Sequence, residues 1–270
     1  MRKFVSLLGL CAVLWSGHGL SEPAPKAPTD RWIVDFDDAQ CVAMRNYGTK
    51  ESPFVLALKQ PALGEVMQLS VVRPGTGAAF AEEHDASISV DGGNPIQLTA
   101  VSAAVRQTHN VVVRMNVPRS TFDLISRAKT IRVRAKDQLD DTFQLSQVDG
   151  VLKVLDQCVA DLRRVWNVGD QPPTPLKKRV QGTIAGLITS DDYPGAALDN
   201  DERGTVTYAL LINEAGKVAD CTVIETSGVA ALDAQSCATI KARAQFVPAV
   251  GLDGKPAKDA TTGKVTWDIR

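Results

Sequence analysis

Short runs in which apolar and polar residues alternate fill most of the first half of the chain. They are rich in β-branched residues and are separated by turn sequences such as Asp91-Gly92-Gly93-Asn94. A period of two predicts strands with one buried face. The runs are Trp32–Phe36, Cys41–Tyr47, Phe54–Leu58, Val66–Val72, Ser87–Val90, Ile96–Val101, Val111–Val117, Ile131–Ala135 and Thr142–Leu145.

Two stretches of this region have a helical period instead. Phe122–Ala128 follows Pro118 and predicts a short helix. Farther along, an apolar stripe bounded by Asp149-Gly150 and Gly169 predicts an amphipathic helix. Its members are Val151, Leu155, Cys158, Leu162 and Val165. Residues 30–167 are therefore expected to form a β-rich domain closed by one helix.

The last third of the chain mixes the two periods and predicts a small α+β domain at residues 184–270. A three-stranded antiparallel sheet with helices is expected there. The expected elements are a short helix at Pro194–Asp199, a strand from Thr205 to Ile212, a turn at Asn213–Gly216, a return strand Lys217–Thr226, a helix from Asp233 to about Ala244, and a strand Lys264–Ile269.

Two Pro-rich segments connect these parts. Residues 22–29 predict a tether, and residues 170–183 predict a linker that includes Pro172, Pro173 and Pro175. The basic run Lys177-Lys178-Arg179 is interpreted as solvated linker charge, with contact to anionic lipid as the alternative.

The N-terminus has the pattern of an export signal. A basic start, Met1-Arg2-Lys3, precedes the apolar run Phe4–Trp15 and several small residues. This run is shorter than the roughly 20 apolar residues of a membrane-spanning helix. Residues 1–21 are therefore predicted to be a cleaved signal peptide, which places the mature protein in the periplasm. The alternative is a retained anchor in the inner membrane, with the protein facing the periplasm.

Four cysteines lie beyond the signal, and an even number in an exported protein favours disulfides. Of the three possible pairings we expect Cys41–Cys158 and Cys221–Cys237, because each pair then stays within one domain. The apolar stripe also places Cys158 against the sheet. Buried free thiols are the alternative.

Composition and motifs give little support to other classes of function. The formal net charge is −1, so a nucleic-acid partner is not expected. The sequence contains no hydrolase, metalloprotease, nucleotide-binding or dinucleotide-binding motif. His84 and His109 both lie among polar residues. Asp199–Gly204 is read as a turn before a strand rather than a calcium loop. No catalytic residue, metal, cofactor or small-molecule substrate is inferred, and the protein is predicted not to be an enzyme.

An ordered set of short elements in residues 184–270 resembles the TonB C-terminal domain. The set comprises Tyr193-Pro194, Gly204–Cys221, Thr226-Ser227-Gly228, Leu232-Asp233, Phe246–Ala249, Gly254-Lys255-Pro256 and Val265–Ile269. The resemblance implies that the final strand accepts an extended strand from an outer-membrane transporter, helped by residues near Tyr193. The implied partner-binding residues are Asp192, Tyr193, Pro194, Val265, Thr266, Trp267, Asp268 and Ile269. Ser190-Asp191-Asp192 departs from the family's Gln-Pro-x. The first domain faintly resembles the invasion-associated locus B family of exported proteins.

These observations predict a periplasmic, TonB-like protein-binding module linked to outer-membrane transport. Its expected partner is an envelope protein or a transporter peptide. Self-association at a sheet edge is the alternative to binding a peptide. Val218 and Ile224 are expected on the sheet face opposite Cys221, and dimerisation through that face is a further hypothesis. One alternative is an anchored TonB-type energy transducer. Another is a periplasmic enzyme with an unrecognised site in residues 30–167.

Overall fold

The computed structural model describes residues 24–64, 66–78, 81–105, 107–168 and 175–269, so the expected signal peptide lies outside the described residues. Nine strands form one antiparallel sheet in the order β1-β2-β3-β4-β7-β6-β5-β8-β9. All nine expected strands are present. Their bounds are β1 Ile33–Asp37, β2 Gln40–Gly48, β3 Pro53–Gln60, β4 Val66–Pro74, β5 Glu82–Val90, β6 Ile96–Val105, β7 Asn110–Pro118, β8 Thr130–Ala135 and β9 Leu139–Gln144.

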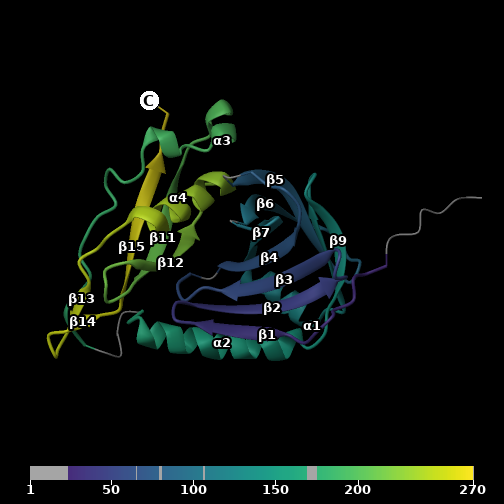
Figure 1. The fold of residues 1–270 in the computed structure, drawn as a ribbon, viewed down its shortest axis with the longest axis horizontal. Helices are drawn as coiled ribbons and strands as arrows, with labels where there is room; N and C mark the ends of the chain where they lie inside the picture. Colours follow the sequence, from purple (N-terminus) through teal and green to yellow (C-terminus); the bar gives the residue numbers. More distant parts are fainter. Residues whose placement is uncertain (1–23, 65, 79–80, 106, 169–174, 270) are drawn as a thin grey trace, which may run out of the picture.

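The large sheet curls until its two ends approach each other (Figure 1). The segment predicted to be a tether lies between them: Lys26 bridges Phe143 of β9, and Pro28 bridges Tyr47 of β2. The Tyr47 hydroxyl donates to the carbonyl of Gln144 at 2.9 Å. Burial raises the pKa of Tyr47 to about 12, so the phenol stays a neutral donor. Residues 24–29 thus help to join the two ends of the sheet.

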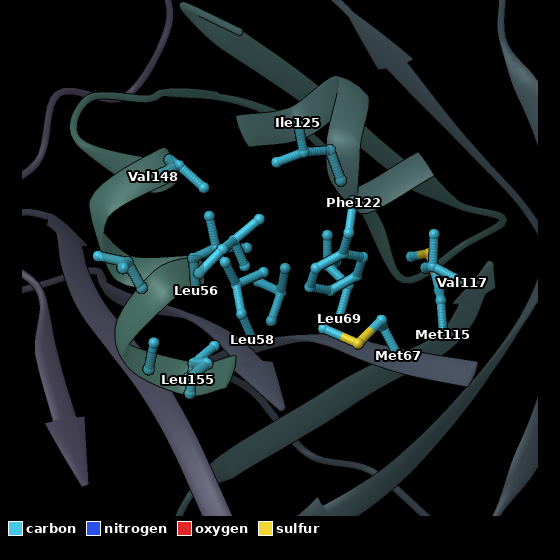
Figure 2. Packing of buried hydrophobic residues seen from close by; sticks show 14 of the residues in the cluster. Leu56, Leu58, Met67, Leu69, Met115, Val117, Phe122, Ile125, Val148 and Leu155 are labelled. Atoms are coloured by element: carbon cyan, nitrogen blue, oxygen red, sulfur yellow. The ribbon is translucent and has the colours of Figure 1, made fainter. Parts of the chain in front are cut away.

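The inside of the curled sheet is the main hydrophobic core. Two helices, α1 (Arg119–Arg127) and α2 (Val148–Val165), pack on it and contact each other. Figure 2 shows Phe122 and Ile125 of α1 pointing toward Leu56, Leu58 and Leu69 of the sheet. The predicted stripe on α2 is buried except at its last member, since Val165 is 54% exposed and Trp166 is buried instead. Trp166 lies four residues after Leu162, with its backbone N–H bonded to the Leu162 carbonyl, and its indole donates to the carbonyl of Asp38 at 2.7 Å.

The C-terminal domain contains the expected three-stranded antiparallel sheet, in the order β12-β11-β15. Its elements are η1 Ser190–Asp192, α3 Gly195–Asp199, β11 Gly204–Ile212, β12 Val218–Glu225, α4 Ala230–Arg243 and β15 Asp259–Trp267. A second small sheet combines β10 Leu176–Lys178, β13 Ala249–Gly251 and β14 Pro256–Ala257. Residues 176–178, expected to be solvated linker, therefore pair with β13. In the described part of the chain, no helix is long and apolar enough to cross a membrane.

Two element boundaries in this domain were predicted wrongly. Helix α4 begins at Ala230, before Asp233, whose carboxylate instead accepts from Thr226 and Ser227 in the preceding loop. Strand β15 begins at Asp259, five residues earlier than predicted. Its first half, Ala260–Gly263, has small and polar side chains that give no alternating pattern.

Both predicted disulfides are confirmed. Cys41 of β2 is bonded to Cys158 of α2, with Cα atoms 6.1 Å apart. Cys221 of β12 is bonded to Cys237 of α4, with Cα atoms 5.5 Å apart. Each bond fastens a helix to the sheet that it covers.

The second face of the C-terminal sheet packs against the first domain, as Figure 1 shows. Leu211, Ala219 and Ala260 join the core cluster of the nine-stranded sheet. The buried carboxylate of Asp220 accepts from Lys59 at 3.0 Å. The expectation that Val218 lies opposite Cys221 is wrong, because a bulge at Ala219 turns Val218 toward α4. Leu211, Ala219 and Ala260 of this face are thus covered within the chain, whereas Ile224 lines a cleft between the domains.

Candidate functional site

The two edge strands of the C-terminal sheet differ in regularity. Strand β12 pairs with β11 through two register shifts, at Ala219 and at Ile224. Strand β15 pairs with β11 without interruption over nine residues, from Asp259 to Trp267. Bulges on an edge strand hinder pairing with a further strand, whereas a regular edge permits it. The geometry therefore favours β15 as a docking edge.

The orientation of Ala260 sets the direction of the backbone groups along the rest of β15. The carbonyl of Ala260 accepts from Arg179, and its N–H donates to the Asp259 side chain, so Ala260 points away from β11. Backbone groups alternate in direction along an antiparallel strand. The N–H and C=O groups of Thr262, Lys264 and Thr266 accordingly also point outward. Among the described residues no backbone hydrogen bond from outside the sheet reaches them.

A groove of about 490 Å³ runs along this edge. One wall is Thr261–Thr266 of β15 and the other is the segment 182–188, which lies beside β15 in Figure 1. Gly182, at φ +146°, lets the second wall cross the Phe246 ring, since an added Cβ would lie 2.7 Å from it. Gly263 similarly leaves room for the ring of Tyr208 on the paired strand. The groove is therefore an open channel beside an unpaired strand edge.

An ion pair between the exposed Arg179 and the buried Asp259 fixes the groove wall to the start of β15. The fully buried carboxylate of Asp259 accepts from Arg179 Nε at 2.8 Å and from the N–H of Val180 at 2.8 Å. The hydrogen bond to Asp259 raises the pKa of Arg179. Sequence analysis missed this pair because Arg179 belonged to a run interpreted as solvated charge.

The structure places the sequence-predicted Asp192 inside the domain. Its side chain is 6% exposed and accepts from Arg243 at 2.7 and 2.8 Å. The N–H of Thr189 also donates to it, which completes a capping box around η1. Asp192 therefore holds the Tyr193-Pro194 turn against α4 and does not present a carboxylate to the groove.

Tyr193 and Trp267 meet, although they lie far apart in sequence. Their rings contact edge to face, with centroids 5.1 Å apart. The Tyr193 hydroxyl donates to the carbonyl of Glu202 at 2.5 Å, and the Trp267 indole donates to Ser236 of α4 at 2.9 Å. Trp267 is thus a buried core residue, although the resemblance implied a partner-binding role for it.

The remaining predicted residues divide by burial. Pro194 and Val265 are buried, Thr266 and Asp268 are exposed, and Ile269 is half-buried. Thr266 shares a side-chain hydrogen bond of 3.1 Å with Thr205, and Asp268 lies 3.9 Å from Arg203. Of the eight residues, Thr266 alone combines an exposed side chain with backbone groups that point away from β11.

Acidification is expected to weaken the Tyr193-Pro194 turn that Asp192 holds against α4. The hydrogen bonds from Arg243 and Thr189 hold the pKa of Asp192 below its ordinary value of 3.8. The stabilisation is complete above that value and is lost as pH falls through the lower pKa of the folded state. Asp192→Asn should therefore lower the urea midpoint at pH 7. Between pH 4 and pH 2 the variant should lose less stability than the wild type. Equal pH slopes for the two proteins would contradict this assignment.

The two histidines His84 and His109, weak candidates for catalysis or metal binding, lie in different parts of the first domain. His84 lies on β5 and not in a loop, with Nε2 2.7 Å from the Ser102 hydroxyl, while His109 lies in an exposed turn. In the ranges that the structure covers, no group of three His, Cys, Asp or Glu side chains could hold a metal ion. The site that the geometry does provide is a backbone edge.

Comparison with protein families supports the sequence resemblance of this domain. Residues 190–269 match the family model described as Gram-negative bacterial TonB protein C-terminal. That match links the domain to outer-membrane transport and to a protein partner. The similarity of the first domain to the invasion-associated locus B family gains no support.

The other comparisons add no argument. No curated protein matches the chain. Among solved structures, the tetra-tandem repeat in the extending region of a large adhesion protein aligns over 89% of this chain and 74% of that chain, with 10% sequence identity and a TM-score of 0.17.

Proposed function

We propose that the C-terminal domain is a periplasmic module that binds an extended peptide of an envelope protein, such as an outer-membrane transporter. The peptide would add a fourth strand to the sheet by pairing with the outer edge of β15. The observation that carries this proposal is the regular, unpaired edge of β15 facing the 490 Å³ groove. Binding involves no turnover, and the family match agrees with a protein partner.

Backbone pairing would supply affinity, and the groove wall would supply selectivity. The outward N–H and C=O groups of Thr262, Lys264 and Thr266 would pair with the peptide backbone. Ile184 and Ile188 of the opposite wall would contact alternate side chains of the peptide, because successive side chains of a strand point to opposite faces. The exposed ammonium of Lys264 on β15 lies 3.8 Å from the exposed carboxylate of Glu225 on β12, across the sheet.

A proline at an outward-facing position tests the strand-pairing mode. Thr262→Pro removes one outward N–H without removing a bond to β11, so the domain should fold. We expect peptides from the N-termini of outer-membrane transporters to bind the wild type and to lose at least about tenfold in affinity with this variant, since one pairing bond is lost and the edge is blocked. Fluorescence anisotropy of labelled peptides measures the effect.

The matched control is Thr262→Ala, which keeps the N–H and removes the same exposed side chain. It should bind like the wild type. Equal affinities for the Pro and Ala variants, with both proteins folded by circular dichroism, would exclude pairing at this edge. Light scattering on the same samples separates peptide binding from self-association: a wild-type dimer that Thr262→Pro dissociates would show that a second copy occupies the edge.

A further inference from the structure

A second and larger cavity lies between the two domains, away from β15. It has a volume of about 950 Å³. Its floor is the outer face of β4, β7 and β6, and its other wall is the free edge of β12 with the start of α4. This arrangement can be followed in Figure 1, where β12 and α4 face β4 and β6.

Contacts between the domains close the two ends of this cleft. At one end Lys59 binds Asp220, and Lys241 adds a second ammonium 3.5 Å from the same carboxylate. At the other end the Glu83 carboxylate accepts from the N–H of Ala231 at 3.1 Å, in the first turn of α4. Anionic side chains are favourable at a helix N-terminus. The domains are thus held apart at a fixed spacing, and the cleft is a built feature.

The walls of the cleft are mainly apolar, and a cation that no described residue pairs, Arg114, lies on its floor. Val66, Leu98, Val101, Val223 and Ile224 line it, together with the Cys221–Cys237 disulfide. Arg114 of β7 lies on the floor between them, half-buried. Val101 of β6 pairs with Arg114 of β7. Two residues farther along β7, Asn116 pairs with Gln68 of β4.

Arg114 has no counter-charge among the described residues. The other cations of the lining are paired, Lys59 with Asp220 and Arg119 with Asp156. The acidic lining residues are engaged as well: Asp233 accepts from Thr226 and Ser227, and Glu225 accepts from Thr207. Burial without compensation lowers the pKa of Arg114. The guanidinium is half-buried and, within the described part of the chain, unpaired in a largely apolar cleft, so it is available to an anion from outside the chain.

We infer that the cleft binds a small organic anion with an apolar body and a carboxylate head, and that Arg114 is the residue that receives the carboxylate. A guanidinium matches a carboxylate in a two-bond arrangement. Asn116 and Gln68 are placed to donate further bonds, and the apolar walls enclose the body. The volume falls within the ~300–1,000 Å³ range of small-molecule sites. A peptide strand is disfavoured because β12 is bulged twice.

Titration calorimetry on the full mature chain tests this inference with decanoate and 1-decanol as probes. Decanoate should bind the wild type with one saturable site, and 1-decanol should bind at least about tenfold more weakly. Arg114→Met should weaken decanoate binding about tenfold or more, as expected for the loss of a charged hydrogen-bonded pair. Arg114→Lys should be intermediate, and Arg127→Met, which removes an exposed cation of α1, should bind like the wild type.

A second variant covers the apolar part of the site. Val101→Trp fills the cleft and should abolish decanoate binding while keeping Arg114. Neither variant touches β15, so the binding of peptides at that edge should be unchanged, and the two sites can fail independently. The inference is overturned if decanoate shows no saturable binding to the wild type, if Arg114→Met binds it equally well, or if 1-decanol matches decanoate.

Discussion

Removal of the Cys41–Cys158 disulfide should cost the first domain about 4–5 kcal/mol of unfolding free energy. The bond closes a loop of 117 residues, and the chain-entropy estimate for a loop of about 100 residues is about 4.7 kcal/mol. Both cysteines are buried, at 0% and 5% exposure, so Cys→Ala at each position adds little polar cost. Urea unfolding of the double Ala variant, followed by far-ultraviolet circular dichroism, measures the loss.

The second disulfide provides the matched comparison. Cys221–Cys237 spans only 16 residues, for which the same estimate gives about 3 kcal/mol. Its removal should lower the stability of the C-terminal domain by the smaller amount, which a shift in Trp267 fluorescence can report. Equal losses for the two pairs, or a larger loss for the shorter loop, would show that loop entropy does not govern their contribution.

The strand pattern of the first domain could be predicted from the sequence because each strand has one buried face. Alternation in Val111–Val117, for example, follows the burial of Val111, Val113, Met115 and Val117 directly. The strand order could not be predicted in the same way. Placing β7 between β4 and β6 depends on how the whole sheet curls around one core, and no local pattern records that.

The failures at the C-terminal sheet have a local cause. A single extra residue at Ala219 reverses which side chains of β12 face α4, and nothing in the sequence around Val218 marks the bulge. The start of β15 was missed because its side chains are small and polar. Its strand conformation is imposed by nine consecutive pairs with β11 and by the anchoring of Asp259.

The partner-binding role that the resemblance implies for eight residues stays a prediction, and the structure shows only how they are placed. Strand β15 does present a free edge, yet Asp192, Pro194, Val265 and Trp267 are buried supports of that edge. The groove wall at 182–188 and the charge of Arg114 in the second cleft could not be predicted, since both depend on contacts between segments far apart in the chain.

Arg179→Met should have the second large effect, about 1–3 kcal/mol of unfolding free energy in the C-terminal domain. The substitution removes the cation from the fully buried carboxylate of Asp259. Because the Arg179 side chain is 53% exposed, solvent screens the pair, and the expected cost is that of a buried acceptor losing one partner, about 1–3 kcal/mol. The segment that continues from Arg179 forms the groove wall, so peptide binding at β15 should weaken together with stability. Urea unfolding and the anisotropy assay measure both effects on the same variant.

A double variant distinguishes the lost pair from simple lost packing. In Arg179→Met/Asp259→Ala the buried charge is gone, so the double change should cost clearly less than the sum of the two single changes. Lys178→Met, one residue away and exposed, removes a cation of the same run and should change stability by less than about 0.5 kcal/mol. If the double variant is additive, or if Lys178→Met is as damaging as Arg179→Met, then the ion pair does not hold the groove wall in place. The open edge of β15 would in that case be set by the sheet alone.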